Sequence, residues 1–254
     1  MGRPTISLEL GRYLLTDNIR DEVDWYRTPQ SCGEAPPPVQ KAIPQGSTVI
    51  TLPSIEQSTI PSADLLQVIR TRRSHRRFSD AAVSLEELAF LLYCTQGVTE
   101  AIHPAAVLRT VPSAGCRHPF ETYLVVQRVT GLEPGVYRYL PLDHAVIRLT
   151  VPSAGLMPEL VRAVRGQRFV AGAAVTFVWT AIPARTEWRY AEASTKVIAL
   201  DAGHLCQNLY LACGAIGAGT CAIAAYDQES ADRLVNVDGK EEMVVYLSPV
   251  GKLA

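Results

Sequence analysis

Five arginines, a serine and a histidine are concentrated in residues 70–78 of a 254-residue chain whose net charge is −1. Guanidinium groups this close together repel one another unless an anion lies between them. Their N–H groups match the oxygen atoms of a phosphate, and the hydroxyl of Ser74 can add a neutral hydrogen bond. The residue types leave several interpretations open: a binding site for a phosphorylated ligand or, less specifically, a solvated helix end or a nucleic-acid patch.

Three further places contain residues that can contact a ligand. Residues 112–115 are small and turn-prone, which suits close approach of the backbone to a flat ligand, although local sequence alone favours a plain loop. His204 lies in an apolar helical segment and can act as an acid, a base or a metal ligand, but no second ligand follows at helical spacing. We therefore favour a structural histidine that pairs with Asp201. His118 can contact a ligand or cap the strand that follows it.

Missing motifs argue against several classes of protein. The sequence contains no Gly-x-Gly-x-x-Gly after a strand, no P-loop and no Gly-x-Ser-x-Gly, so dinucleotide-binding, P-loop and serine-hydrolase functions are not indicated. The six cysteines show neither a CxxC pair nor zinc spacing, so we expect no metal site and a reducing, cytoplasmic setting. The near-zero net charge and the lack of a long apolar run argue against nucleic-acid binding and against a membrane span.

Helical signals flank the basic stretch. The segment that starts near Asp64 has apolar residues at helical spacing and leads directly into the arginines. Ser84 and Glu87 form a capping-box pattern for a second helix, which is expected to end at Gly97. The basic stretch is therefore predicted to lie between two helices, where backbone N–H groups can also contact an anion.

The rest of the chain mixes strands and helices without regular alternation, which predicts an α+β fold with a central antiparallel or mixed sheet flanked by helices. Residues 1–61 contain many prolines and are predicted to form an irregular arm packed on a body that spans 62–254, or a partly disordered tail. Residues 194–216 are apolar or small nearly all round, which predicts a helix buried in the protein or in an oligomer interface. The other expected elements are a loop over 98–121, strands over 122–129, 171–182 and 243–250, a hairpin over 135–149, and helices over 157–164 and 227–236.

Four separated stretches resemble the nitroreductase superfamily of flavoenzymes and, within it, the SagB-type dehydrogenases, which oxidise azolines to azoles in peptides. The likeness spans residues 62–252 in the family's order and depends on the four stretches together. They are 72–78 (RRSHRRF), similar to R-x-S-x-R-x-F; 112–119 (PSAGCRHP), similar to P-S-A-G-x-R-H-P; 200–209 (LDAGHLCQNL) with 217–220 and 224–227; and 249–252 (PVGK).

This resemblance implies a nitroreductase-like fold and a homodimer that binds FMN at the subunit interface, so that each site draws on both chains. The matching positions for the ribityl phosphate of FMN are Arg72, Arg73, Ser74 and Arg76, joined by Lys252 from the end of the chain.

The resemblance also implies which residues contact the flavin ring. A loop of the other subunit would lie against the isoalloxazine, and its residues are Pro112, Ser113, Ala114 and Gly115. Ala224 and Ala225 would approach the redox edge of the flavin through their backbone N–H groups.

One position departs from the family's pattern. SagB-type enzymes tend to have a Lys-Tyr pair shortly before the Asp-Ala-Gly-His stretch, and this pair is the suggested base that removes a proton from the substrate. The matching pair in this sequence is Arg189-Tyr190. A guanidinium stays protonated near neutrality and is a poor base. Either Tyr190 acts alone with Arg189 as a neighbouring cation, or the base has been lost and another oxidation or a reduction is catalysed. Arg189 can also be a surface or FMN-adjacent cation without a role in proton transfer.

Three functions are therefore expected in decreasing order. The first is an FMN-dependent oxidoreductase that dehydrogenates a peptide-derived or carrier-bound azoline (thiazoline or oxazoline) or a related heterocycle in natural-product biosynthesis, together with a cyclodehydratase or a peptide synthetase. The second is an NAD(P)H-dependent reductase of nitro, quinone or enone compounds. The third is a flavin-binding subunit of a modifying complex without turnover of its own.

Overall fold

A seven-stranded sheet lies at the centre of the computed structural model, which describes residues 7–103, 105–149 and 155–253. Its strands are β1 (Val49–Thr51), β4 (Phe120–Val126), β5 (Gly135–Leu140), β6 (Ala145–Arg148), β7 (Val175–Ala181), β8 (Ala218–Thr220) and β9 (Met243–Lys252). The strand order is β1-β6-β5-β4-β7-β9-β8, and neighbouring strands are antiparallel. β4 and β7 are buried on both faces, which explains why their sequences are rich in apolar and β-branched residues.

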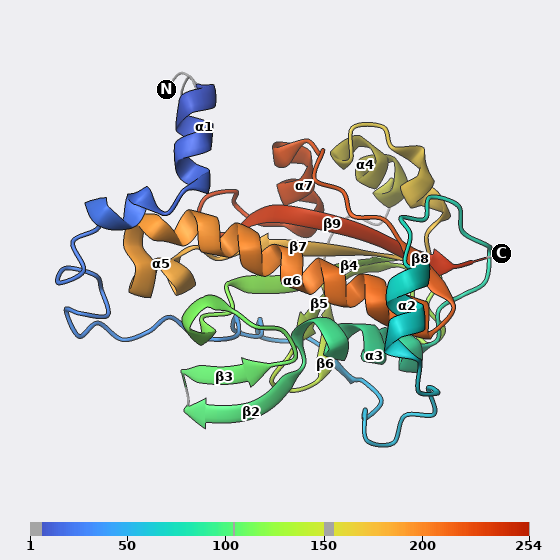
Figure 1. The fold of residues 1–254 in the computed structure, drawn as a ribbon. Coiled ribbons are helices and arrows are strands. Elements are labelled where there is room, and N and C mark those ends of the chain that lie inside the picture. The colour runs from blue at the N-terminus through green and yellow to red at the C-terminus, as the bar shows by residue number, and fades with distance from the viewer. Residues whose placement is uncertain (1–6, 104, 150–154, 254) are drawn as a thin grey trace.

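Helices cover both faces of this sheet. α3 (Leu85–Gln96) and α6 (Ser194–Ala215) pack on one face, and α4 (Leu156–Ala163) and α7 (Gln228–Val235) pack on the other (Figure 1). Because successive side chains of a strand point to opposite faces, the buried apolar residues divide into two clusters. Leu209 of α6 packs in the cluster of Trp179, and Leu234 of α7 packs in the cluster of Val178. The predicted α+β fold is confirmed, and the sheet is antiparallel throughout.

The two helices predicted around the basic stretch are present. α2 (Leu65–Thr71) begins after Asp64, whose side chain accepts a hydrogen bond from the backbone N–H of Gln67 at 2.8 Å. The capping box of α3 is complete, because the Ser84 hydroxyl accepts from the Glu87 N–H and the Glu87 carboxylate accepts from the Ser84 N–H. Between these helices, Ser74 forms a parallel bridge with Thr220, which fixes the basic stretch beside β8.

Residues 98–121 were predicted to be a loop, and most of that prediction is wrong. They contain a second, two-stranded sheet of β2 (Val98–His103) and β3 (Ala106–Arg109), followed by the short 3₁₀ helix η2 (Ala114–Cys116). β2 is almost entirely exposed, and its pairing with β3 contains two register shifts. An exposed, irregular hairpin lacks the alternation of apolar and polar residues by which a strand is recognised in a sequence.

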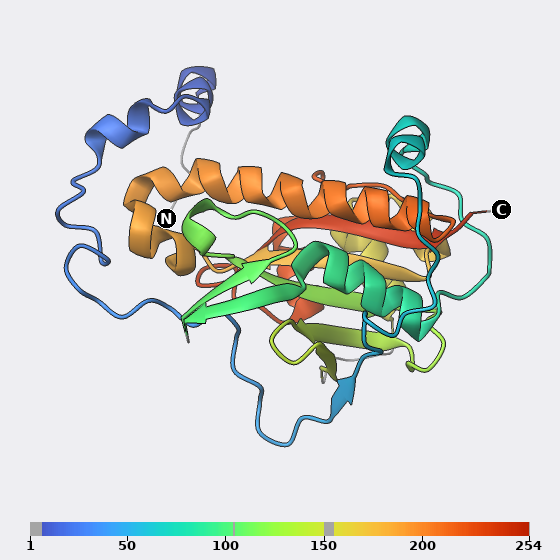
Figure 2. The ribbon, with the colours of Figure 1, turned by 60° about the horizontal axis from the view of Figure 1, so that its bottom comes forward.

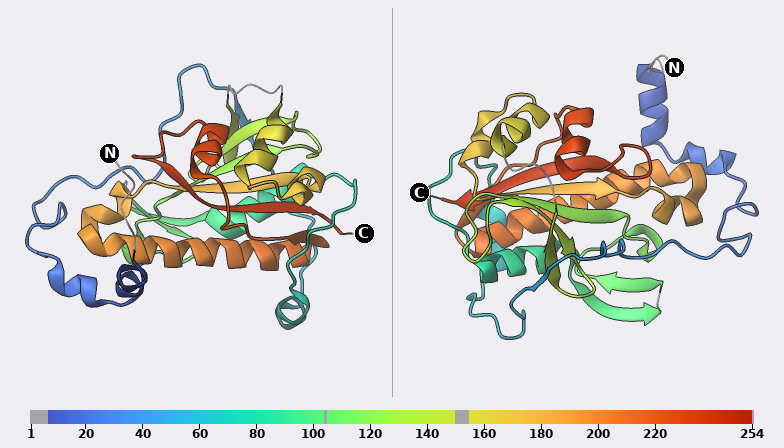
Figure 3. Two further views of the ribbon diagram at one scale, coloured as in Figure 1. Left: turned by 90° about the horizontal axis from the view of Figure 1, so that it is seen from above. Right: turned by 180° about the vertical axis from the view of Figure 1, so that it is seen from behind.

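The N-terminal arm carries more structure than its prolines indicate. It contains α1 (Leu8–Leu15) and the 3₁₀ helix η1 (Asn18–Glu22), neither of which was predicted, and the short strand β1. α1 and α2 stand at opposite ends of α6 (Figure 2), and the arm between them runs along the body (Figure 3). Hydrogen bonds from Trp188 Nε1 to the Glu34 carbonyl (2.9 Å) and from the Lys41 N–H to Glu121 (3.0 Å) tie the arm down. Residues 1–6 of the predicted arm and residue 254 of the predicted body lie outside the described residues.

The six cysteines are free thiols, and Cys206, Cys213 and Cys221 are buried. Burial disfavours the thiolate and raises the pKa of Cys206 to about 11. In the described part of the chain, no helix combines the length and the apolarity that crossing a bilayer requires.

A short helix that the sequence did not reveal carries the Arg189-Tyr190 pair. α5 (Ala184–Tyr190) ends there, and the 3₁₀ helix η4 (Ala191–Ala193) then leads into α6. The chain turns sharply between them at Ala191, whose φ of 45° and ψ of −127° lie in a region that L side chains rarely adopt. The orientation of Tyr190 therefore depends on a strained residue next to it.

Replacing Ala191 with glycine is expected to stabilise the protein. Glycine removes a conformational strain on the order of 1–3 kcal/mol, while its greater freedom in the unfolded chain costs about 0.5–1 kcal/mol. We expect the free energy of unfolding to rise by about 1 kcal/mol in chemical denaturation. The control is Ala184→Gly, an exposed position inside α5 with ordinary helical geometry, where the same substitution should destabilise the protein. Equal destabilisation by both substitutions would show that Ala191 is not strained.

Candidate functional site

The guanidinium groups of Arg72 and Arg76 are held by aromatic rings. Arg72 Cζ lies 5.3 Å from the centre of the Tyr210 ring, and Arg76 Cζ lies 5.9 Å from that of Phe169. Within the described residues, neither arginine forms an ion pair with a carboxylate. A guanidinium group without a carboxylate partner retains the capacity to bind an anion.

The other members of the predicted phosphate site are placed differently. Ser74 Oγ lies 2.9 Å from the Tyr210 hydroxyl. The Arg73 guanidinium donates to the carbonyls of Arg70 (3.1 Å) and Arg72 (2.8 Å), at the C-terminal end of α2. The structure thus brings Arg72 and Ser74 to the end of α6 that carries Tyr210, while Arg76 lies on Phe169 and Arg73 is partly used in ending a helix.

Lys252 is engaged in a contact that the sequence did not indicate. Its ammonium donates to Glu87 Oε1 and to the carbonyl of Ile216, each at 2.6 Å. These bonds join the end of β9 to α3 and to the end of α6. Its predicted role at the phosphate remains a prediction and would require sharing the ammonium with Glu87.

The loop after β8 presents backbone N–H groups to the outside. Ile223 and Leu247 form a bridge in which the Ile223 carbonyl accepts from the Leu247 N–H at 3.2 Å. Because the carbonyl and the next N–H of a trans peptide point in opposite directions, the Ala224 N–H points away from β9. Over the described ranges, the N–H groups of Ala224 and Ala225 donate to no protein acceptor, and both residues are exposed. Free donors of this kind suit an acceptor atom of a ligand.

A cavity of about 780 Å³ adjoins Ala224 between α5, α6 and β9. Its walls are mainly apolar and include Ile198, Ala202, Val245 and Tyr246. An apolar cavity with a few hydrogen-bond donors at its edge is typical of a site for a flat organic ligand.

The loop of residues 112–115 is anchored on α6 by Asp201. The Ser113 hydroxyl donates to Asp201 Oδ2 at 2.6 Å, and the Ala114 N–H donates to the same oxygen at 3.1 Å. Asp201 is only 5% exposed, and this burial raises the pKa of its carboxyl. The sequence indicated Asp201 only as a partner of His204, and its anchoring of this loop was missed.

Both histidines considered in the sequence can now be placed. His204 is not a satisfied, buried residue: its side chain is 47% exposed and its Nδ1 lies 3.8 Å from Asp201 Oδ1, because that carboxylate is occupied by the loop. His118 is buried, which lowers its pKa to about 3, and its N–H donates to Ser113 Oγ at 2.9 Å. It is a neutral residue that shapes the loop.

Arg189 and Tyr190 lie directly against Gly115. Gly115 has a φ of +58°, and a Cβ added to it would lie 2.7 Å from Arg189 Cδ and 2.9 Å from the Tyr190 hydroxyl. Only glycine fits at this position. The guanidinium carbons of Arg189 and Arg20 each lie 5.8 Å from the centre of the Tyr190 ring. The structure therefore brings the predicted catalytic pair and the predicted ring-contacting loop together.

These residues form two groups at different points along α6. Asp201 holds the loop group, and Tyr210, nine residues further on, adjoins the arginine group, so the helix separates the two by about 14 Å. The outer face of α6 between them is exposed and includes Ala199, Gly203 and Gln207. One chain therefore presents two halves of a site on either side of an uncovered helix face.

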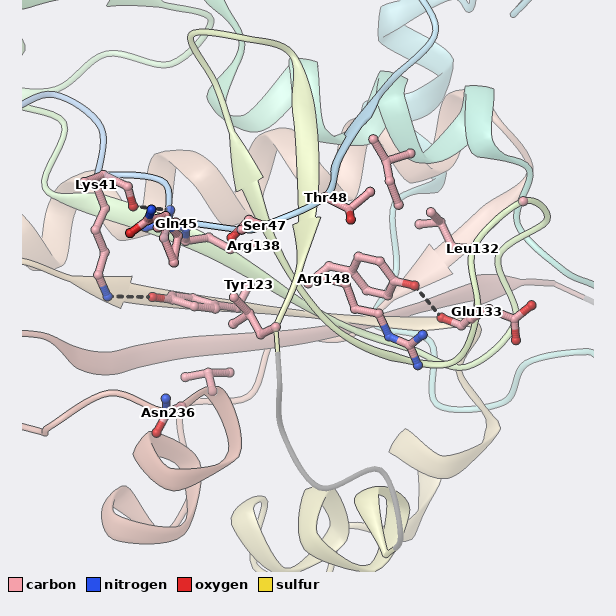
Figure 4. Close-up of a pocket in the computed structure, with 18 residues that line it drawn as sticks. Lys41, Gln45, Ser47, Thr48, Tyr123, Leu132, Glu133, Arg138, Arg148 and Asn236 are labelled. Atoms are coloured by element: carbon pink, nitrogen blue, oxygen red, sulfur yellow. Dashed lines mark hydrogen bonds between the residues drawn. The ribbon is translucent and has the colours of Figure 1, made fainter.

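Another cavity, with a volume of about 860 Å³, lies at the edge of the sheet under the N-terminal arm (Figure 4). Three cations line it, but Lys41 pairs with Glu242. Arg138 is opposite Ile147 and Arg148 is opposite Tyr137, so these arginines leave opposite faces of the sheet and do not form one anion site. Across the described residues, no cluster of His, Cys, Asp or Glu could hold a metal ion.

Comparisons with known proteins show the family of this chain. The sequence profile of the nitroreductase family matches residues 69–252, so the chain belongs to the nitroreductase family, whose members are flavin-using oxidoreductases. MJ1384 of Methanocaldococcus jannaschii, which is named as a nitroreductase, is 32% identical over 203 residues. These residues are 80% of this chain and 96% of that protein. The trifolitoxin-processing protein TfxB of Rhizobium leguminosarum bv. trifolii is 30% identical over 146 residues, which are 53% of this chain and 38% of TfxB.

Solved structures confirm the nitroreductase-like fold. A protein of Ralstonia eutropha JMP134 named as a nitroreductase is 24% identical with a TM-score of 0.67, over 87% of this chain and 95% of that one. A chain of the E. coli microcin synthetase McbBCD complex with truncated pro-MccB17 bound is 18% identical with a TM-score of 0.59, over 100% of both chains. A Desulfovibrio desulfuricans protein named as a nitroreductase and solved with FMN is 21% identical with a TM-score of 0.52, over 76% of this chain and 88% of that one.

Removing the Asp201 carboxylate is expected to release the 112–115 loop. Asp201→Ala leaves the Ala114 N–H without its acceptor, and we expect the free energy of unfolding to fall by about 2–3 kcal/mol. Asp201→Asn keeps an acceptor oxygen and should be milder. Because burial raises the pKa of Asp201 above its ordinary value of 3.8, the folded state holds this proton more tightly than the unfolded state. The wild type should therefore lose stability relative to Asp201→Asn as the pH rises from that value through the raised pKa.

Chemical unfolding at several pH values measures both effects. Asp80→Asn serves as the control, since Asp80 is exposed and the substitution should leave the pH dependence unchanged. An Asp201→Ala protein with unaltered stability would contradict the anchoring role.

Proposed function

We propose that the chain is an FMN-dependent oxidoreductase. The observation that carries this proposal is the presence of three features among the described residues: the guanidinium groups of Arg72 and Arg76 without a carboxylate partner, the N–H groups of Ala224 and Ala225 without a protein acceptor, and the apolar cavity that Ala224 lines. A flavin mononucleotide has a phosphate at one end and a flat, largely apolar ring with acceptor atoms at the other. The described residues therefore fit this cofactor, and the relative solved with FMN supports the choice.

The separation of the two groups along α6 favours a homodimer. If two copies pack the outer faces of α6 against each other in opposite directions, the arginine group of one chain meets the 112–115 loop of the other. Small residues such as Ala199 and Gly203 on this face permit close approach of the two helices. Each site then contains the Arg72 group of one protomer and the Gly115 group of its partner.

We infer that the reaction is the dehydrogenation of an azoline or a related heterocycle in a peptide-derived or carrier-bound substrate, alongside a cyclodehydratase or a peptide synthetase. Two relatives support this: one is named for processing trifolitoxin, and the other belongs to a synthetase complex with a peptide bound. An azoline becomes an azole by losing one hydride and one proton. When bound, FMN supplies the acceptor for the hydride.

The chain's own residues position the ring and remove the proton. The N–H groups of Ala224 and Ala225 donate to the redox edge of the ring, and Arg72, Ser74 and Arg76 hold the phosphate. Tyr190 Oη takes the proton from the substrate carbon, and the guanidinium groups of Arg189 and Arg20 stabilise the negative charge of its phenolate. Arg189 itself cannot accept a proton.

An NAD(P)H-dependent reduction of nitro, quinone or enone compounds is the second candidate. The arginine at position 189, where a lysine is expected, and the name of the M. jannaschii relative both favour it. Rapid NAD(P)H oxidation with a quinone, together with no turnover of an azoline peptide, would favour this reductase over the dehydrogenase. The McbBCD relative supports a third candidate, a flavin-binding subunit of a modifying complex without turnover of its own. Such a subunit would take up FMN and show neither activity.

The cofactor assignment is tested by flavin binding to the purified protein. We expect the wild type to take up FMN and to show flavin absorption. Arg72→Ala/Arg76→Ala removes two charge-assisted interactions with the phosphate, so FMN affinity should fall at least about 100-fold while riboflavin affinity changes little. Arg233→Ala, in an exposed ion pair with Glu229 on α7, is the control. Full FMN affinity in the double variant would refute the phosphate assignment, and a colourless wild type that takes up no FMN would refute the enzyme.

The role of Tyr190 is tested with Tyr190→Phe. We expect turnover of an azoline-containing peptide to fall by about 10²–10⁴-fold, because the proton acceptor is lost, with FMN affinity unchanged. Tyr26→Phe is the matched control, since Tyr26 is 91% exposed. Unchanged turnover in Tyr190→Phe would remove this residue as the base.

A further inference from the structure

Tyr210 lies between two parts of the site that the sequence treats as unrelated. Its hydroxyl is 2.9 Å from Ser74 Oγ and 2.9 Å from the backbone nitrogen of Ala222. The same ring carries the Arg72 guanidinium at 5.3 Å. A single side chain of α6 thus contacts the arginine segment and the beginning of the loop that leads to Ala224.

Chemistry fixes the direction of one of these two hydrogen bonds. The Ala222 N–H can only donate, so the Tyr210 oxygen accepts from it. Between Tyr210 and Ser74 either hydroxyl can be the donor, and in the arrangement where the phenol donates, the serine's own proton is free for an anion. In both arrangements Tyr210 fixes the position of the Ser74 hydroxyl.

The contact with Arg72 has a parallel effect. A carboxylate in this place would neutralise the guanidinium and compete with an anionic ligand, whereas an aromatic ring holds the flat group by its face. The N–H groups at the edge of the guanidinium stay available. The backbone of the segment is already fixed by the bridge between Ser74 and Thr220, so the side chains are what Tyr210 can still orient.

We propose that Tyr210 is a positioning residue that couples the phosphate-binding side chains to the loop of residues 221–226. This inference rests on the proposed FMN site. It assigns to Tyr210 the placement of the phosphate-binding side chains relative to the loop of residues 221–226. The Tyr210 hydroxyl fixes the Ser74 side chain relative to the Ala222 amide, and the Tyr210 ring fixes the orientation of the Arg72 guanidinium. Tyr210 thus adds a side-chain link between the loop and the arginine segment, beside the backbone bridge between Ser74 and Thr220.

Tyr210→Phe tests the inference because it keeps the ring and removes both hydrogen bonds. We expect FMN affinity to fall about tenfold and riboflavin affinity about threefold or less, so that the preference for the phosphorylated flavin decreases. Hydrogen exchange of the peptide that contains residues 221–226 should be faster, since the Ala222 N–H has lost its acceptor. Tyr210→Leu also removes the support of Arg72 and should weaken FMN binding by roughly a further two- to fivefold.

Tyr139→Phe is the matched control. The Tyr139 hydroxyl lies 2.8 Å from His144 Nδ1, outside the site, so this variant loses a comparable hydrogen bond without touching the flavin. It should leave the FMN-to-riboflavin preference and the exchange of residues 221–226 unchanged.

Two results would overturn the inference. One is a Tyr210→Phe protein with an unchanged FMN-to-riboflavin preference, and the other is unchanged hydrogen exchange in residues 221–226. If the wild type binds neither flavin, the proposed function fails and this inference fails with it. FMN binding by the wild type with an unaltered preference in the variant refutes the role of Tyr210 alone.

Discussion

The arrangement of the site depends on one constraint, the burial of α6 against the sheet. Apolar residues such as Leu205 and Leu209 fix the helix in the core, and its polar residues then reach segments that are distant in the sequence. Asp201 holds the loop at Ser113, and Tyr210 holds Ser74 and Ala222. Each such hydrogen bond contributes only about 1 kcal/mol, so the apolar contacts supply most of the stability and the polar contacts supply position. Because α6 is rigid, the distance between the two groups is also fixed.

Charged side chains also divide into two kinds, those paired with an opposite charge and those held by aromatic rings. The carboxylate of Glu87 pairs with Lys252, and the buried pair of Glu121 and Arg185 joins β4 to α5. Arg72 and Arg76 of the basic stretch lie on aromatic rings and, among the described residues, have no carboxylate partner. Cations held in this way keep their N–H groups available to an anion.

Local patterns in the sequence predicted the elements that obey local rules. The capping box at Ser84 identified α3, and the apolar runs identified β4 and β7 because these strands are buried on both faces. The hairpin of β2 and β3 was missed because β2 is exposed and its pairing with β3 is irregular, and α5 was missed because its seven residues are too few to show a period.

The sequence indicated the segments of the candidate site but not the contacts that join them. The likeness to the nitroreductases indicated the arginine segment, the 112–115 loop and Ala224, all of which lie at the surface near α6. The contact between Asp201 and Ser113 joins residues 88 positions apart, and no local pattern contains it. Tyr210 resembles a core residue in an apolar helix, and only its two hydrogen bonds distinguish it. The proximity of Gly115 to Arg189 and Tyr190 likewise results from tertiary packing.

The two outermost strands of the large sheet protect its edges. β1 and β8 are each three residues long, and Thr220 of β8 is already bridged by Ser74 of the basic stretch. Strands this short offer little unpaired backbone to another chain, so the sheet resists growth by addition of strands and the aggregation that follows from it. The edges of the sheet are therefore poor places for another chain to bind.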